Sequence, residues 1–142
     1  MQIHIETLSD PPVPLQDFLW AQLRQHGLSR LDAAGLEATA FLANVARQGG
    51  DIVGGTLGHV FYGGYNLQLL WIREELRGRG LGQRLLEAVE AQARAYACSV
   101  IFGFSFGFQA PGFYLKAGYT TIGTIEDYPP GYACHFLSKR LS

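Results

Sequence analysis

The segment Arg77-Gly78-Arg79-Gly80-Leu81-Gly82 is the part of this 142-residue chain whose residue types most clearly indicate chemistry. It follows an apolar run (67–72) and precedes a helical pattern (83–96). Glycines let the backbone turn tightly and approach a ligand closely, and the first turn of a helix presents unpaired N–H groups with a partial positive charge. The segment is therefore predicted to bind an anion such as a phosphate group.

The glycine spacing distinguishes between known phosphate loops. A dinucleotide loop, G-x-G-x-x-G, would need a glycine at position 83, which is Gln83, and a nucleotide-triphosphate loop would need a lysine after the glycines, which is absent. A nucleotide-binding regulatory domain is an alternative function, and it would require this loop to hold ATP or NAD without either of these glycine patterns. The spacing that remains, R-x-x-G-x-G from Arg77 through Gly80 to Gly82, resembles the acetyl-coenzyme A pyrophosphate loop of the GNAT superfamily of N-acetyltransferases. A glycine-rich turn without a ligand is the structural alternative.

A second segment, residues 108–119, carries the same resemblance. Its sequence FQAPGFYLKAGY is similar to the family's short helix with a phenolic tyrosine, followed by a lysine-x-glycine-aromatic exit into the next strand. Together with the DYPPG turn at 127–131, it resembles a bacterial subgroup of the superfamily. The resemblance implies that Tyr114 is the general acid, since a phenol with a pKa near 10 can protonate a departing thiolate. Packing of Tyr114 on the sheet, like that of Phe113, is the alternative role.

The resemblance implies an enzyme that uses acetyl-CoA as co-substrate and acetylates the primary amine of a small molecule by direct attack. The pantetheine arm would pair with the backbone of the strand before the loop, much as an added strand does. The oxyanion is expected to be stabilised by a main-chain N–H near Trp71 or Ile72. The predicted cofactor-binding residues are Leu70, Trp71, Ile72, Arg77, Gly78, Arg79, Gly80, Leu81, Gly82, Gln83 and Gln109.

The general base is where the chain departs from its relatives. Proteins of this subgroup often carry Glu two residues before the Leu-Trp pair, where this chain has Gln68, an amide that cannot accept a proton at physiological pH. Relatives usually have Asp-Thr where this chain has Phe104-Ser105. These departures favour a rival function, an acyl-CoA-binding module with weak or lost catalysis. A base acting through water stays open, with candidates that are each more often structural or solvated: Glu126, Asp127, His135 and His59.

Composition limits the other classes of function. With 48% hydrophobic and 16% charged residues, the chain is typical of a single globular domain over residues 1–142, and no apolar run reaches the roughly 18 residues of a membrane span. A net charge of −1 argues against nucleic-acid binding, which needs a concentrated basic face. The first residues contain no basic patch followed by an apolar core, so we expect a cytoplasmic protein.

The two cysteines indicate neither a metal site nor a disulfide. Cys98 and Cys134 lie far apart, with no further Cys or His at metal-ligand spacing, so we expect two core thiols and no metal. Cys134 and His135 could form a nucleophile and base pair. Adjacent residues on a strand point to opposite faces, however, which argues against that pair.

The elements that must position these residues predict an α/β fold. Because strands lie on both sides of a strand–helix–strand crossover, we expect a mixed, mostly antiparallel sheet of six or seven strands with a central parallel pair, flanked by about four helices. The resemblance implies a GNAT-like sheet in which this central pair is splayed. The cleft would open where the parallel strands diverge, at their carboxyl ends. The predicted strands are 3–7, 41–47, 52–61, 65–72, 100–106, 120–125 and 132–138, and the predicted helices are 15–26, 83–96 and 111–116.

Three further expectations concern less regular features. Residues 30–38 are predicted to form a weak helix or a loop after a helix stop at Gly27. The alternating phenylalanines at 102, 104, 106 and 108 lie on one side of an extended segment, so we expect core packing, with an aromatic acceptor pocket as the alternative. The resemblance also allows a homodimer formed through the last two strands.

Overall fold

The computed structural model describes residues 2–31, 36–109 and 111–141, and it divides the chain into two compact units, Met1–Leu36 and Glu37–Ser142. The first unit contains helix α1 (Val13–Arg30), which begins with proline at its first turn and continues through Gly27 to Arg30. The predicted stop at Gly27 is therefore wrong, because a single glycine disfavours a helix by only about 1 kcal/mol. Within the described chain, no helix combines the length and apolar character needed to cross a membrane.

The first predicted strand is also wrong. Residues 3–7 have no regular secondary structure. Alternation of apolar residues gives a segment the pattern of a strand, but the strand forms only when a neighbour accepts its backbone hydrogen bonds. The predicted weak helix or loop at 30–38 lies partly outside the described residues.

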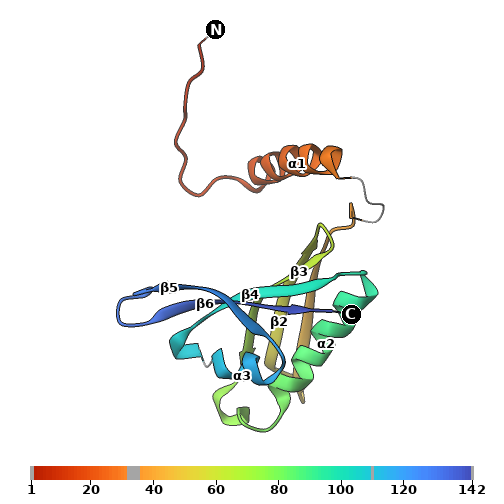
Figure 1. The fold of residues 1–142 in the computed structure, drawn as a ribbon, viewed down its shortest axis with the longest axis vertical. Helices are drawn as coiled ribbons and strands as arrows, with labels where there is room; N and C mark the ends of the chain where they lie inside the picture. Colours follow the sequence, from red (N-terminus) through yellow and green to blue (C-terminus); the bar gives the residue numbers. More distant parts are fainter. Residues whose placement is uncertain (1, 32–35, 110, 142) are drawn as a thin grey trace. The chain divides into compact units, whose positions relative to one another are not determined.

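The second unit is built on a six-stranded mixed sheet with the order β1-β2-β3-β4-β6-β5 (Figure 1). The helices on it are α2 (Leu81–Ala95) and α3 (Pro111–Lys116), with two short 3₁₀ turns at Glu74–Leu76 and Gly107–Gln109. The strands are β1 (Ala40–Gln48), β2 (Asp51–Phe61), β3 (Gly64–Ile72), β4 (Val100–Phe106), β5 (Thr120–Glu126) and β6 (Ala133–Arg140).

The sheet confirms the predicted mixed topology. β1, β2 and β3 form consecutive antiparallel hairpins, and β4 is antiparallel to β6. β3 and β4 are the central parallel pair, joined by the crossover through α2. The second hairpin turns at Tyr62 and Gly63, both with positive φ, which is the geometry of tight hairpin turns.

The core lies between the sheet and one face of α2. The buried positions of α2 recur at the spacing of one helical face, and they pack against β3, β4 and β6 around Tyr65, Ile101 and Leu137. Cys98 and Cys134 are both buried with free thiols, as expected, and Cys98 belongs to this core. The buried residues of α2 are Gly82, Leu85, Leu86, Val89 and Ala93.

The phenylalanines of β4 are not core residues as a group. The buried residues of this strand are Ile101 and Ser105, whereas Phe104 is 52% exposed and Phe106 is half-buried. Phe104 contacts Phe106 and its cross-strand neighbour Phe136, with ring centroids 5.6 and 6.2 Å apart. Phe102, Phe104 and Phe106 share one face of β4, but the core lies on the opposite face because α2 and α3 pack there. Phe108 lies beyond the strand, in the 3₁₀ turn Gly107–Gln109.

A polar network fixes α2 to three strands. The Gln92 side chain accepts a hydrogen bond from Tyr65 Oη at 2.7 Å and one from Asn44 Nδ2 at 2.8 Å, and it donates to the Ala43 carbonyl at 3.3 Å. Asn44 also donates to Thr56 Oγ1. Desolvation by burial raises the pKa of Tyr65 to about 12, so its hydroxyl stays a donor.

Replacing Gln92 with alanine should lower the free energy of unfolding by about 1–3 kcal/mol, because Tyr65 Oη and Asn44 Nδ2 would lose a partner in a half-buried site. Chemical denaturation of both proteins measures the change. Gln83→Ala is the matched control, since Gln83 lies on the exposed side of the same helix. Equal losses for the two variants would contradict the stabilising role of the network.

Candidate active site

The parallel strands β3 and β4 separate after three residue pairs. Gly64, Tyr65 and Asn66 pair with Val100, Ile101 and Phe102, and no pair follows. At the point of divergence Gly103 abuts the Leu67 carbonyl so closely that a Cβ on Gly103 would lie 2.5 Å from the oxygen. Beyond this point the carboxyl half of β3 has no strand pairing on its β4 side, which is where an extended ligand can bind.

A bulge in β3 determines which side chains face the core in this half. The register with β2 shifts so that Leu57 opposes Leu69 and Gly58 opposes Leu67, which leaves Gln68 as the extra residue. Gln68 is exposed, and the alternation after it is reversed. Leu70 and Ile72 are half-buried, and Leu70 packs against the core, whereas Trp71 is 46% exposed. The bulge thus interrupts the ladder beside the diverging strands.

The arginine and glycine segment forms the loop between β3 and α2. Gly78 and Gly80 have φ values of +77° and +83°, which L side chains rarely adopt. Gly80 is the residue that precedes the first turn of α2, and no side chain caps this helix end. The N–H groups of the first turn are therefore not satisfied by a side-chain cap and are suited to an anion.

Two contacts hold the loop in place. The Arg77 side chain donates from Nε to the Ile72 carbonyl at 3.0 Å, and the Arg73 N–H donates to the Val53 carbonyl at 2.8 Å. Gly82 is buried, and a Cβ there would lie 2.8 Å from the Phe113 ring, so glycine lets α2 approach α3. The Nε of Arg77 thus binds the end of β3 and stabilises the start of the loop.

Tyr114 lies on α3, which packs beside the first turns of α2. It is half-buried, and its ring makes edge contacts with Phe113 at 5.1 Å and with Tyr119 at 5.7 Å. Desolvation by burial raises the pKa of its phenol above the ordinary value of about 10. Its hydroxyl has no hydrogen-bond partner among the described residues. The group is therefore protonated at neutral pH and available to donate.

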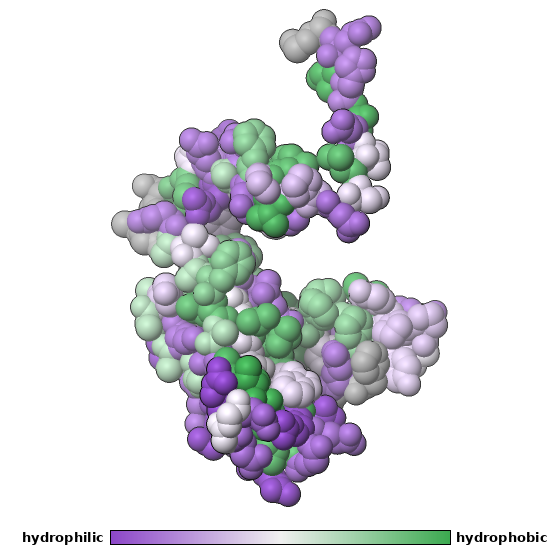
Figure 2. All heavy atoms as spheres, turned by 180° about the vertical axis from the view of Figure 1, so that it is seen from behind, coloured by the Kyte–Doolittle hydropathy of each residue, from purple (hydrophilic) through white to green (hydrophobic). Residues whose placement is uncertain are grey.

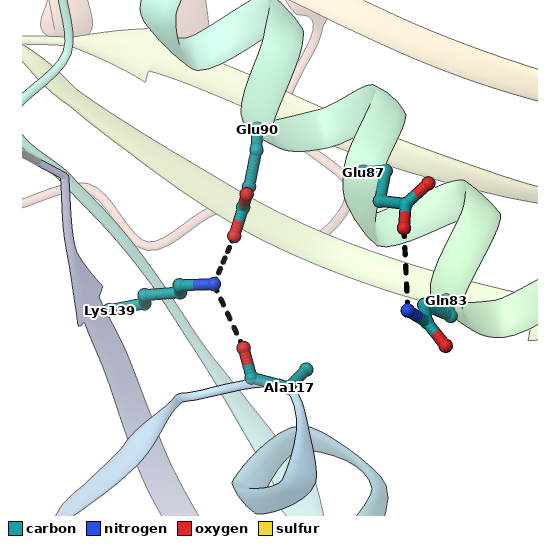
Figure 3. A network of polar contacts seen from close by, with 5 residues as sticks. All are labelled: Gln83, Glu87, Glu90, Ala117 and Lys139. Atoms are coloured by element: carbon teal, nitrogen blue, oxygen red, sulfur yellow. Dashed lines mark hydrogen bonds and ion pairs between the residues drawn. The ribbon is translucent and has the colours of Figure 1, made fainter.

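A lysine fastens the end of α3 to the rest of the fold (Figure 3). Lys139 on β6 forms an ion pair with Glu90 of α2 and donates a hydrogen bond to the Ala117 carbonyl at 2.9 Å. Both charged side chains are partly buried, and the cation also lies 5.8 Å from the centre of the Tyr119 ring. A cation at the carbonyl end of a helix is stabilising, so this contact fixes the short helix that carries Tyr114.

Comparison with known proteins identifies the family. The Acetyltransferase (GNAT) family matches residues 4–119. The chain belongs to this family. The blasticidin-S acetyltransferase of Streptomyces morookaense is 41% identical over 112 residues, which cover 78% of this chain and 81% of that protein.

Solved structures agree with this assignment. A Bacillus cereus acetyltransferase has a TM-score of 0.82 at 31% identity, covering 96% of this chain and 98% of its own. A Bacillus anthracis acetyltransferase in complex with acetyl coenzyme A has a TM-score of 0.64 at 15% identity, covering 72% of this chain and 63% of its own, and shows likeness of fold alone.

The structure of this acetyltransferase brings most of the predicted cofactor residues to one end of the sheet. Residues 70–72 end β3, residues 77–83 form the loop and first turn of α2, and Tyr114 lies on the helix that packs against Gly82. Gln109 follows β4, and its side-chain oxygen accepts a hydrogen bond from the Phe106 N–H at 3.2 Å. This hydrogen bond occupies the side-chain oxygen of Gln109 at the end of β4. The role of Gln109 in cofactor binding stays a prediction.

The candidate bases of the acetyltransferase occupy different environments. Asp127 accepts a hydrogen bond from the Gly131 N–H at 2.9 Å within a turn. His59 stacks on Phe41 at 4.2 Å and opposes Asn66, at the paired end of β3 rather than the open one. Burial lowers the pKa of His59, so it is neutral at neutral pH.

His135 is the candidate whose place in the sheet is most compatible with the open end. It opposes Ser105 near the end of β4. It lies two residues before Leu137 and four before Lys139, so it shares with them the face of β6 that is turned toward α2 and α3. Its Nδ1 lies 3.3 Å from Thr124 Oγ1. Cys134 is on the opposite face, so the two adjacent residues cannot act as a nucleophile and base pair.

Sequence reasoning did not identify Lys139 or Gln92 as residues that position the site. Each acts through partners distant in sequence, at separations of 22 to 49 residues for Ala117, Tyr65, Asn44 and Ala43. No local motif marks either residue. Among the described residues no group of three or more His, Cys, Asp or Glu side chains could hold a metal ion.

Proposed function

We propose that this protein transfers the acetyl group of acetyl-CoA to the primary amine of a small molecule, by direct attack of the amine on the thioester. The observation that carries the proposal is the divergence of β3 and β4 at Gly103, because the unpaired half of β3 then runs from Leu67 to Ile72 and leads into the glycine loop. An extended pantetheine chain would occupy the gap and pair with the backbone of residues 70–72. Its pyrophosphate would then reach the N–H groups at the start of α2.

The chemical steps assign a role to each part. The amine attacks the thioester carbonyl carbon, and the oxyanion that forms would accept a hydrogen bond from a main-chain N–H near Trp71 or Ile72. When the tetrahedral intermediate collapses, the carbon–sulfur bond breaks and the thiolate leaves. The attacking nitrogen releases its extra proton to water. Tyr114, which burial keeps protonated, would donate its proton to the leaving sulfur and then regain a proton from solvent.

The acceptor is proposed from the relatives and not from a pocket. The name of the Streptomyces morookaense relative makes blasticidin S the first amine to test, followed by other small primary amines. The test measures release of the CoA thiol from acetyl-CoA with each amine, together with calorimetric binding of acetyl-CoA. Binding with amine-dependent thiol release supports the proposal. Binding without release for any amine supports the alternative, an acyl-CoA-binding module, which the exposed amide of Gln68 favours.

The pH dependence of turnover tests the general acid. Because burial raises the pKa of Tyr114 above its ordinary value of about 10, the phenol should stay protonated, and kcat should not decrease between pH 7 and pH 9. The rate should instead rise over this range as the amine loses its proton. A steady-state pH profile measures this. A decrease in kcat centred below pH 9 would contradict the assignment of the acid to Tyr114.

A further inference from the structure

A hollow of about 410 Å³ lies beside the glycine loop, on the side of the β1–β2 hairpin. Its size falls in the range of ligand sites, which is roughly 300–1,000 Å³. In Figure 2 hydrophilic residues gather at the lower end of the second unit, where Figure 1 shows this loop and the hairpin end. The residues that line the hollow are Val45, Ala46, Arg47, Gln48, Val53, Leu76, Arg79, Leu81 and Arg84.

Three arginines from three separate elements meet in this hollow. Arg47 is the last residue but one of β1, Arg79 belongs to the loop, and Arg84 lies in the first turns of α2. No Asp or Glu is among the lining residues, and none of the three guanidinium groups forms an ion pair with a described carboxylate. Positive charges gathered without partners favour an anion between them, and guanidinium groups match phosphate geometry especially well.

A strand irregularity shapes the hollow. The register between β1 and β2 shifts after Ala46, so that Arg47 opposes Ile52 and Val53 is the extra residue. Bulges of this kind redirect neighbouring side chains. The carbonyl of Val53 accepts the hydrogen bond of the Arg73 N–H, which ties the bulge to the base of the loop. Arg47 is thus held beside the loop although it lies 30 residues before it.

We propose that this hollow binds the phosphorylated ribose of coenzyme A, with Arg47, Arg79 and Arg84 around its 3′-phosphate. The proposal rests on the proposed function, because it needs the pyrophosphate of the same ligand in the loop. Arg79 and Leu81 belong both to that loop and to the hollow. A ligand bound by its pyrophosphate at the start of α2 would place its ribose next to these shared residues. The apolar lining residues would cover the sugar and the base.

The test compares CoA with dephospho-CoA, which lacks only the 3′-phosphate, by calorimetry. The wild-type protein should bind CoA about tenfold more tightly, as expected for charge-assisted hydrogen bonds at an exposed site. Arg47→Gln should remove this preference by weakening CoA binding while leaving the dissociation constant of dephospho-CoA unchanged. Arg140→Gln, which makes the same change of charge on β6 outside the hollow, should retain the wild-type preference.

The outcomes separate the two proposals. If the wild-type protein binds both cofactors equally, or if Arg47→Gln weakens both by the same factor, the 3′-phosphate site is wrong while the function stands. If the wild-type protein binds neither cofactor, the proposed function fails. A titration with inorganic phosphate tests whether the hollow binds a free anion instead. If phosphate alone bound with a dissociation constant as low as that of CoA, the assignment of the hollow to the 3′-phosphate of CoA would also be overturned. Melting temperatures of the variants establish that each is folded.

Discussion

Tyr114→Phe should lower kcat for acetyl transfer by about 100-fold, the lower end of what general acid catalysis contributes. The substitution removes one oxygen and keeps the ring. Its edge contacts with Phe113 and Tyr119 are therefore retained, and α3 should remain packed. The thiolate would then leave without a proton donor, or would take a proton from water. Steady-state kinetics with acetyl-CoA and an accepted amine measures the loss.

The binding step distinguishes catalysis from packing at this position. The dissociation constant of acetyl-CoA should change by less than about twofold, because the phenol acts on the leaving sulfur and not on the phosphates. Tyr62→Phe is the matched control, since Tyr62 lies in the β2–β3 turn at the paired end of the sheet. An unchanged kcat for Tyr114→Phe would show that the residue packs without donating a proton.

Gly80→Val should weaken acetyl-CoA binding by about 100-fold, which is what loss of two charge-assisted hydrogen bonds would produce. Gly80 has a φ of +83° immediately before α2, and a branched side chain disfavours this conformation strongly. The space around Gly80 is open, so the effect comes from the backbone and not from a steric clash. The loop would adopt another path and turn its N–H groups away from the anion.

The control for this prediction is Gly50→Val in the β1–β2 turn. Gly50 also has open space around its Cα, but its φ is not positive, so the same substitution introduces no comparable strain. Calorimetry with acetyl-CoA compares the two variants, and thermal melting checks that both are folded. If Gly80→Val bound the cofactor as tightly as Gly50→Val does, the loop would not be the phosphate site.

The local elements around the site follow from the sequence alone. The bounds of β4 and α3 match the predicted ranges 100–106 and 111–116, because apolar alternation and a proline at a helix start act over neighbouring residues. The glycine spacing of the loop was also readable, since positive φ values at Gly78 and Gly80 are a local requirement. The family resemblance then added the expected splayed strands and Tyr114.

Features that depend on partners distant in the chain follow only from the folded sheet. The bulges at Gln68 and Val53 arise from the pairing of two strands, so neither strand's own pattern predicts them. The approach of Arg47 to Arg79 and Arg84, and the contact of Lys139 with Ala117, require the folded sheet. Residues 3–7 have the apolar alternation of a strand but no regular secondary structure, because a local pattern alone does not make a strand.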